Sequence, residues 1–268
     1  MRTQGQDPEQ PVSALICFNG GAMKKLISAA AAVICCVALA GCSAKLPEGY
    51  DKFTAAREKY EKLDSARVTM TDLDSGDEIM EFSFYFNSSD EMVFSYYGSW
   101  NGEVQQAYSD GAEFFYKEDG DEKWTVISSA DENYVYNVYN RGYRYPYAEG
   151  RIFFLAGEAV ATAEVTETDG ITSITYVYDP DKLNSASMPG VQEEISRFSA
   201  LTTTLNIGSD GIVRDFTESG TVTSVTGEIL TLNMKITVTD VNDVFEVRNP
   251  VDEIYRNGEK PVQTEQAE

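Results

Sequence analysis

Apolar and polar positions alternate with a period of two over most of the chain from residue 80 onward, a pattern that predicts β-strands. The alternation is longest over 228–239, where Leu230, Leu232 and Met234 face one side and Thr231 and Asn233 face the other. By the same criterion, strands are predicted at 80–86, 92–96, 104–108, 112–117, 124–127, 161–167, 171–178, 201–207, 212–225 and 228–239.

Turn residues separate these strands at short intervals. They are Asn101-Gly102, Asp110-Gly111, Asp169-Gly170, Ser209-Asp210-Gly211 and Gly227. Such turns join neighbouring strands in opposite directions, so the sequence predicts an antiparallel meander. One apolar face on each strand predicts a sheet with one buried face and one solvent-exposed face.

Three segments depart from the period of two. Residues 50–65 are predicted to form a helix, with Phe53, Ala56, Tyr60 and Leu63 on one face. Residues 189–198 are predicted to form a short helix. Residues 130–158 are rich in tyrosine and contain Gly142 and Pro146, which predicts an irregular or partly helical insert that packs over the sheet.

The predicted fold class is therefore α+β, mainly antiparallel β. Strands longer than the usual ~5–6 residues favour a single large sheet that curls around its own apolar face over a sandwich of short strands. The N-terminal helix and the insert would cover that face. We expect one domain over residues 50–250 and a disordered acidic tail over residues 251–268.

The segment before this domain has the features of an export signal. Lys24 and Lys25 follow Met23, an apolar run extends over 26–39, and small residues precede Cys42. The run is shorter than the ~20 residues that span a bilayer. Leu39-Ala40-Gly41-Cys42 is a lipobox, so residues 23–41 are predicted to be a lipoprotein signal peptide that is cleaved between Gly41 and Cys42. Cys42 would carry a diacylglyceryl group, with residues 42–49 as the tether.

The polar stretch ahead of Met23 has no role in export. We expect residues 1–22 to be an untranslated upstream extension, with translation beginning at Met23. Of the four cysteines, only Cys42 then remains after maturation, so the mature chain is predicted to have no disulfide. We expect it to lie outside the cytoplasm, held to the bacterial cell membrane by its N-terminal lipid.

The charge and composition exclude several kinds of function. A formal net charge of −23 opposes binding to nucleic acid. Histidine is absent, which removes the commonest general base and the commonest transition-metal ligand. The sequence has no Gly-x-Ser-x-Gly nucleophile motif and no pair of carboxylates that stands out from its many turn-placed acids. We therefore predict no enzyme activity, no catalytic residues and no cofactor.

One acidic stretch, residues 71–78, suggests a calcium loop. Its glycine stands at the fifth position from Asp72 and Ser83 occupies the twelfth, where a calcium loop has glycine at the sixth and glutamate at the twelfth. A solvated turn is the favoured interpretation, and we predict no metal site.

The order of these elements resembles the LolA/LolB/LppX-like superfamily of lipoprotein carriers and lipid-binding lipoproteins. The helix from Phe53 to Leu63, the insert at 130–158 and the long hairpin around Gly227 carry the resemblance, which covers roughly residues 50–250 in architecture and includes no signature motif. The resemblance implies an unclosed half-barrel with a helical lid over an apolar concave face. The lipid anchor makes the chain more similar to the anchored members.

Two groups of aromatic residues are the candidate site. Phe82, Phe84, Phe86, Phe94 and Tyr96 would line a cavity for a lipid chain, or would simply be the packed core. Tyr139, Tyr143, Phe153 and Phe154 of the insert would form a lid, or would pack a long loop onto the sheet.

The leading hypothesis is a membrane-anchored protein that binds a lipid or another hydrophobic ligand, with a role in lipid or lipoprotein transport. The alternative is an anchored scaffold with a filled core that binds an envelope protein partner. In either case we expect a monomer.

Overall fold

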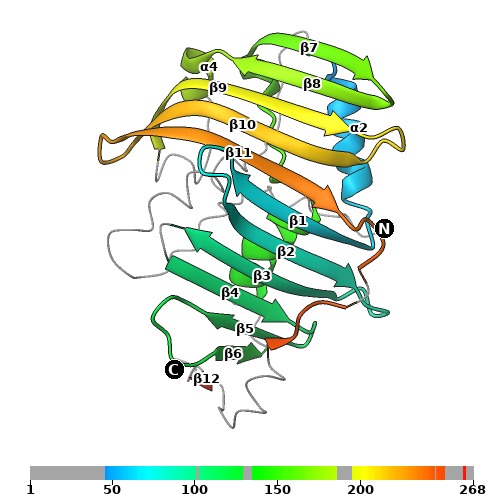
Figure 1. Ribbon diagram of the computed structural model, residues 1–268, viewed down its shortest axis with the longest axis vertical. Coiled ribbons are helices and arrows are strands. Elements are labelled where there is room, and N and C mark those ends of the chain that lie inside the picture. Colours follow the sequence, from blue (N-terminus) through cyan, green and yellow to red (C-terminus); the bar gives the residue numbers. More distant parts are fainter. Residues whose placement is uncertain are drawn as a thin grey trace, which may run out of the picture.

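The computed structural model (Figure 1) describes residues 46–100, 103–128, 135–185, 195–244, 246–250 and 262–263. Four helices lie in this part of the chain: α2 (Tyr50–Tyr60), the π-helix η1 (Val135–Ala148), the short 3₁₀ helix η2 (Gly157–Ala159) and α4 (Pro180–Ser185). The strands are β1 (Ser65–Asp72), β2 (Glu78–Phe86), β3 (Met92–Trp100), β4 (Glu103–Ser109), β5 (Glu113–Lys117), β6 (Thr125–Ser128), β7 (Val160–Thr168), β8 (Ile171–Tyr178), β9 (Ile195–Ile207), β10 (Val213–Ser224), β11 (Ile229–Thr239) and β12 (Val262–Gln263).

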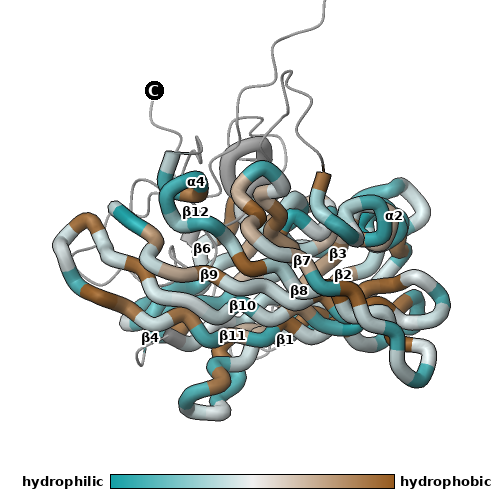
Figure 2. The backbone as a smooth tube through the Cα atoms, turned by 90° about the horizontal axis from the view of Figure 1, so that it is seen from above, coloured by the Kyte–Doolittle hydropathy of each residue, from teal (hydrophilic) through white to brown (hydrophobic). Residues whose placement is uncertain are grey.

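All of these strands belong to one sheet, in the order β12-β6-β5-β4-β3-β2-β1-β11-β10-β9-β8-β7. Two antiparallel meanders, β1–β6 and β7–β11, are joined where β1 pairs with β11. Only the two residues of β12 pair in parallel, with Thr125 and Val126 of β6. The predicted mainly antiparallel fold on a single sheet is confirmed. The predicted curl of the sheet around its own apolar face is wrong: the sheet is twisted and not strongly curled (Figures 1 and 2), because helices cover that face in its place.

Strand β11 illustrates how the alternation of residues sets the two faces. Leu232, Met234, Ile236 and Val238 are buried, whereas the residues between them are more exposed. The hairpin before β11 turns at Gly227, whose φ of +85° lies in the left-handed region that favours glycine. The described strands follow the predicted ones closely, with β1 and the two-residue β12 as additions.

Helices α2 and α4 lie on the same side of the sheet (Figure 2). Phe53, Ala56 and Tyr60 of α2 are buried against it, as the sequence predicts. The predicted helix was too long, because α2 ends at Tyr60 and β1 begins at Ser65. Two hydrogen bonds stabilise the connection between α2 and β1. The Asp64 amide donates to Asn242 Oδ1 over 2.9 Å, and the Val244 amide donates to Ser65 Oγ over 3.1 Å.

The predicted helix over 189–198 is also wrong where the structure describes it. Residues from Ile195 onward belong to β9, in which Phe198 pairs with Val222 of β10. Pairing with β10 supplies the backbone hydrogen bonds that a short helix would otherwise form internally. The nearby helix α4 was not predicted; it buries Leu183 and is linked to β9 by Asn184, whose side chain bonds both the amide and the carbonyl of Phe198.

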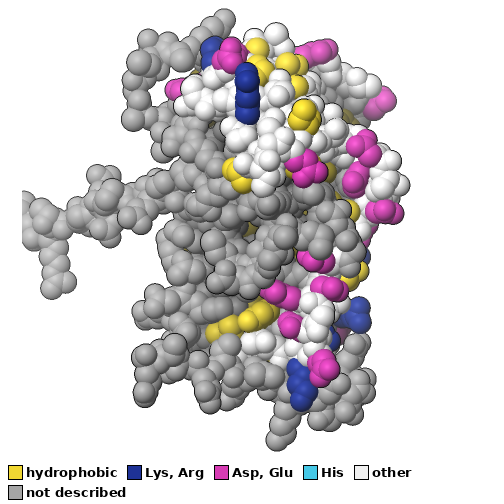
Figure 3. All heavy atoms as spheres, turned by 90° about the vertical axis from the view of Figure 1, so that its left-hand side faces the viewer, with side chains coloured by type: hydrophobic (Ala, Val, Ile, Leu, Met, Phe, Trp, Pro, Cys, Tyr) yellow, Lys and Arg dark blue, Asp and Glu magenta, His cyan; other side chains and the backbone are white. Residues whose placement is uncertain are grey.

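A second, smaller apolar cluster lies apart from the main core. Val93, Tyr108, Phe115 and Trp124 pack there with Val244 and Val247, which follow β11 in the chain. Val93, Tyr108 and Phe115 have the opposite strand parity to Phe94, Ala107 and Phe114 of the main core, so the segment after β11 covers the other face of the sheet. The remaining described surface carries scattered acidic side chains, several of which are visible in Figure 3.

The predicted signal peptide, the lipobox and residues 42–45 of the tether lie outside the described residues. So does the predicted tail, apart from Val262 and Gln263 of β12. Among the described helices, none is both long and apolar enough to cross a membrane.

Candidate ligand-binding interior

The predicted aromatic residues lie together on the helix-covered face of β2 and β3. Strand pairing sets Phe82 opposite Tyr96 and Phe84 opposite Phe94. The Phe82 ring centroid lies 5.3 Å from that of Phe94 and 5.7 Å from that of Phe84. Alternation along each strand and pairing between strands therefore produce one continuous aromatic surface, with ring separations typical of favourable aromatic contacts.

Helix η1 covers this surface with tyrosine rings at four-residue intervals. Tyr143 stacks on Phe94 and Tyr147 packs on Phe82, each with ring centroids 4.9 Å apart. Tyr139 also approaches Phe94, at 5.8 Å, and its hydroxyl donates to the Met92 carbonyl over 2.8 Å. Phe82, Phe84 and Phe94 are each 0% exposed as a result. The side chains of η1 fill the space over these rings.

Phe86 differs from the other members of the predicted aromatic face. It is only partly buried at the end of β2, where its ring meets Phe84 edge-on at 5.9 Å. The Arg144 guanidinium of η1 lies over the Phe86 ring, 5.4 Å from its centroid, in a cation–π arrangement. Phe86 therefore stands at the rim of the aromatic surface.

Burial keeps the tyrosine hydroxyls of this interior neutral. It raises the pKa of Tyr96 to about 12 and raises the pKa of Tyr147 well above its ordinary value. The Tyr60 hydroxyl, from α2, donates to the Tyr147 carbonyl over 2.5 Å, and burial raises its pKa as well. The interior under η1 is thus apolar and uncharged in the described residues, with its hydroxyls bonded inside the protein.

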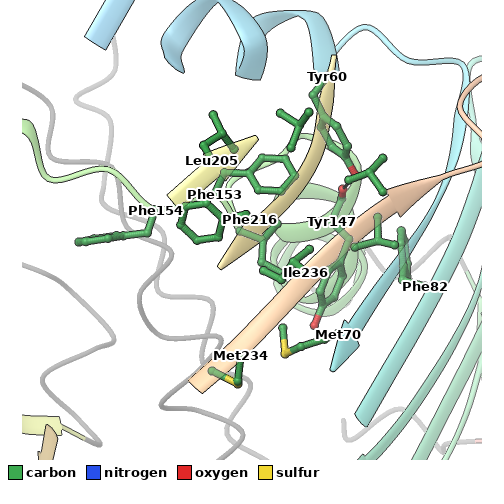
Figure 4. Close-up of a cluster of buried hydrophobic side chains, with 14 of the residues drawn as sticks. Tyr60, Met70, Phe82, Tyr147, Phe153, Phe154, Leu205, Phe216, Met234 and Ile236 are labelled. Carbon is green, nitrogen blue, oxygen red and sulfur yellow. Dashed lines mark hydrogen bonds between the residues drawn. The ribbon is translucent and has the colours of Figure 1, made fainter. Parts of the chain in front are cut away.

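The two remaining predicted lid residues lie in the other half of the core (Figure 4). Phe153 meets Tyr60 edge-on at 5.0 Å and Phe216 of β10 at 5.9 Å. Phe154 packs on Tyr178 of β8 at 5.6 Å. The structure therefore separates the predicted lid: Tyr139 and Tyr143 cover β2 and β3, whereas Phe153 and Phe154 cover β8 to β10.

The half of the core under Phe154 contains a polar group that the sequence analysis missed. Glu218 of β10 is 3% exposed, and among the described residues its Oε1 has no hydrogen-bond partner. Burial raises the pKa of Glu218 to about 8. Thr203 of β9 is its cross-strand neighbour, and the Thr203 hydroxyl lies 3.3 Å from that of Tyr178. The strand period itself could have revealed Glu218, since it shares a face with Phe216.

Tyr147 is the other contact residue that the sequence analysis left out of the lid. Its spacing of four residues from Tyr143, which repeats the spacing between Tyr139 and Tyr143, was the available signal.

As for metal ions, the part of the chain that the structure describes holds no group of three or more Cys, Asp or Glu side chains able to bind one. In residues 71–78, the acidic segment that was compared with a calcium loop, the Asp72 carboxylate accepts hydrogen bonds from the amides of Asp74 and Ser75.

Comparisons with known proteins bear on the fold alone. No protein-family model and no curated protein matches the sequence. Among solved structures, the chain is similar to LprF from Mycobacterium bovis, with 12% identity and a TM-score of 0.41 over 77% of this chain and 99% of LprF. It is also similar to MucB in complex with MucA(peri), with 9% identity and a TM-score of 0.26 over 72% of this chain and 54% of MucB. The predicted resemblance to half-barrel lipoproteins agrees with these likenesses in fold.

Proposed function

We propose that this protein is a membrane-anchored extracytoplasmic lipoprotein that binds a lipid or another hydrophobic molecule between the aromatic surface of β2 and β3 and helix η1. One observation carries the proposal: three tyrosines of a single helix, Tyr139, Tyr143 and Tyr147, lie in line along a face of phenylalanine rings. Phe82, Phe84, Phe86, Phe94 and Tyr96 would contact the ligand. A role in moving lipids or lipoproteins across the envelope would follow.

Ligand entry in this proposal requires η1 to move, because the tyrosine rings now occupy the space over the phenylalanines. Tyrosine suits such an exchange, since its ring packs against apolar groups and its hydroxyl tolerates water. π-Helical turns are rare and are frequently found at functional sites. The described state would be the closed state, with Tyr143 as the central residue of the lid.

A second candidate is favoured by the same filled interior. If η1 never leaves the sheet, the aromatic residues are only the core, and the protein would act as a lipid-anchored scaffold that binds an envelope protein. The 0% exposure of Phe82, Phe84 and Phe94 supports this alternative. The two candidates differ in one property, which is the movement of η1 away from the sheet in the presence of an apolar molecule.

The test uses residues 43–268 without the anchor, which include every described element. Titration with a fluorescent fatty-acid probe should show saturable binding, and mass spectrometry of an organic extract should recover copurified lipid. Tyr143→Ala, which removes a lid ring, should change the probe affinity. Tyr97→Ala, on a ring that is 42% exposed, is the control and should leave it unchanged. Absence of both probe binding and copurified lipid would favour the scaffold.

A further inference from the structure

Three hydrogen-bonding side chains meet in the core beneath Phe154. Tyr178, Thr203 and Glu218 lie on the neighbouring strands β8, β9 and β10, and each is no more than 3% exposed. The hydroxyls of Tyr178 and Thr203 lie 3.3 Å apart. Glu218 is the cross-strand neighbour of Thr203, which brings the carboxyl beside these two hydroxyls.

Glu218 differs from the other two members of the cluster, because within the part of the chain that the structure describes its Oε1 has no hydrogen-bond partner. Burying an unpaired polar group costs ~1–3 kcal/mol, and native proteins contain few such groups. Apolar side chains adjoin the cluster: Met234 is the cross-strand neighbour of Glu218 on β11, and the ring of Phe154 packs on Tyr178. A leucine at this position would avoid the cost, so the acid calls for a functional explanation.

The surroundings of Glu218 also limit the kind of group that it can bind. Thr203 from β9 and Met234 from β11 are the cross-strand neighbours of Glu218, and the Tyr178 hydroxyl from β8 lies 3.3 Å from that of Thr203. Asp215 and Lys235 lie close by on β10 and β11, at positions that alternate with Glu218 and Met234, and they pair with each other at 3.6 Å on the opposite face. Neither Tyr178, Thr203 nor Met234 carries a positive charge that could neutralise an anionic headgroup.

We propose that Glu218, Thr203 and Tyr178 form the polar end of the binding site, and that they bind the free hydroxyl of an uncharged lipid, with a chemistry such as that of an acylglycerol. This inference rests on the proposed function. A protonated carboxyl both donates and accepts a hydrogen bond, and so matches a hydroxyl group. Burial raises the pKa of Glu218 to about 8, so the protonated form prevails at neutral pH.

The experiment compares ligands that share one acyl chain and differ at the polar end. The anchor-free protein, residues 43–268, is titrated with 1-oleoylglycerol, methyl oleate and oleate, each competing with the same fluorescent probe at pH 7. We expect 1-oleoylglycerol to bind about tenfold more tightly than methyl oleate, as one additional buried hydrogen bond allows. Oleate should bind more weakly than 1-oleoylglycerol, because its charge would enter a site without a cation.

Three variants locate the source of the preference. Glu218→Leu should bind 1-oleoylglycerol and methyl oleate equally, with the methyl oleate affinity retained. Glu218→Gln should keep most of the preference, because an amide also donates and accepts. Glu228→Leu is the control, since Glu228 is an exposed acid in the hairpin between β10 and β11, and it should behave as the wild type.

The outcomes separate this inference from the proposed function. Wild-type protein that binds methyl oleate and 1-oleoylglycerol equally overturns the polar site while the apolar site stands. A preference that survives in Glu218→Leu also overturns it. Wild-type protein that binds none of the three ligands overturns the proposed function and the polar site with it. The wild-type comparison needs no variant, so it remains decisive even if a Glu218 variant does not fold.

Discussion

The ring of Tyr143 stacks on the ring of Phe94, with centroids 4.9 Å apart and planes inclined by 27°. This contact joins the middle of η1 to the middle of β3. Tyr96, the cross-strand neighbour of Phe82, meets the same tyrosine edge-on at 5.3 Å. Tyr143 therefore holds the helix against two residues of one strand, and the stability of this contact decides whether η1 is a lid or a permanent part of the core.

Truncation of the aromatic surface should reveal two kinds of position. Phe94→Ala should lower the free energy of unfolding by ~3–5 kcal/mol, because it leaves a void among Phe82, Phe114 and Tyr143. Phe86→Ala should cost clearly less, since Phe86 is only partly buried at the rim, and should weaken ligand binding instead. Urea denaturation of both variants measures the difference.

Phe84 and Tyr96 decide between the two proposed functions in the same experiment. If any of Phe84, Phe86 or Tyr96 loses ligand binding with little loss of stability, the residue lines a site that opens. Losses of ~3–5 kcal/mol at all three positions, together with absence of probe binding, would leave the filled scaffold as the remaining interpretation.

The turn after η1 depends on a glycine that no other residue can replace without a shift in the core. Gly150 has a φ of +67°, and a Cβ at this position would lie 2.7 Å from Cδ1 of Tyr60. Gly150→Ala should therefore cost more than the ~1–2 kcal/mol of left-handed strain alone. Gly120→Ala is the matched control, because Gly120 has a φ of +82° with nothing within 4 Å of the added atom.

Thermal unfolding of the two glycine variants tests this difference. The melting temperature of Gly150→Ala should fall well below that of Gly120→Ala. Equal melting temperatures would mean that the Tyr60 ring moves aside without cost, and would contradict the tight packing of α2 against the turn.

The strand prediction succeeded where the sequence itself alternates and a turn residue ends each run. In β11, Leu232 and Met234 face the core because the strand period is two, whatever the neighbouring strands are. Residues 195–198 were assigned to a helix instead of a strand, because Val191, Ile195 and Phe198 have a spacing that also fits one face of a helix. In the structure Phe198 pairs with Val222 of β10 and is part of a strand. A local pattern does not reveal this pairing, because Val222 is distant in sequence.

The candidate site, like the strands, was predicted only in part from the sequence. Alternation placed Phe82 and Phe84 on one face of a strand and added Phe94 and Tyr96 from the next, and in the structure the pairing of β2 with β3 joins them. The division of the lid between Tyr143 and Phe154 could not be predicted, because it depends on where the chain crosses from one meander to the other. The lack of a partner for Glu218 depends on side chains from three strands, which no local pattern specifies.

The anchor is a prediction that concerns residues outside the described part of the chain. Cys42→Ala should block lipidation and the cleavage after Gly41, because the diacylglyceryl group is attached to the Cys42 thiol before cleavage. The variant should therefore remain as a larger, unlipidated precursor. Fractionation of cells and the mass of the purified protein measure both effects, with Ser43→Ala as the control that should mature normally. A Cys42→Ala protein that still matures and partitions with membranes would refute the lipobox.

Glu218 should make stability depend on pH in a direction opposite to that of most carboxyl groups. Burial raises its pKa from 4.5 to about 8 in the folded protein. Between these two values the folded state holds a proton that the unfolded state has released. Stability contributed by this group is therefore highest below pH ~4.5, falls by ~1.4 kcal/mol for each pH unit toward 8, and is constant above that.

Glu218→Gln should remove this dependence, because an amide does not titrate. The free energy of unfolding of the wild type and the variant, measured by urea denaturation from pH 5 to pH 9, should diverge as the pH rises. The variant should become the more stable protein by a few kcal/mol at pH 8, since the wild type then buries a charge without a partner. Glu228→Gln, at an exposed position, should follow the wild-type curve throughout. Parallel curves for the wild type and Glu218→Gln would show that the Glu218 carboxyl reaches water, and would remove the basis for a polar end of the binding site.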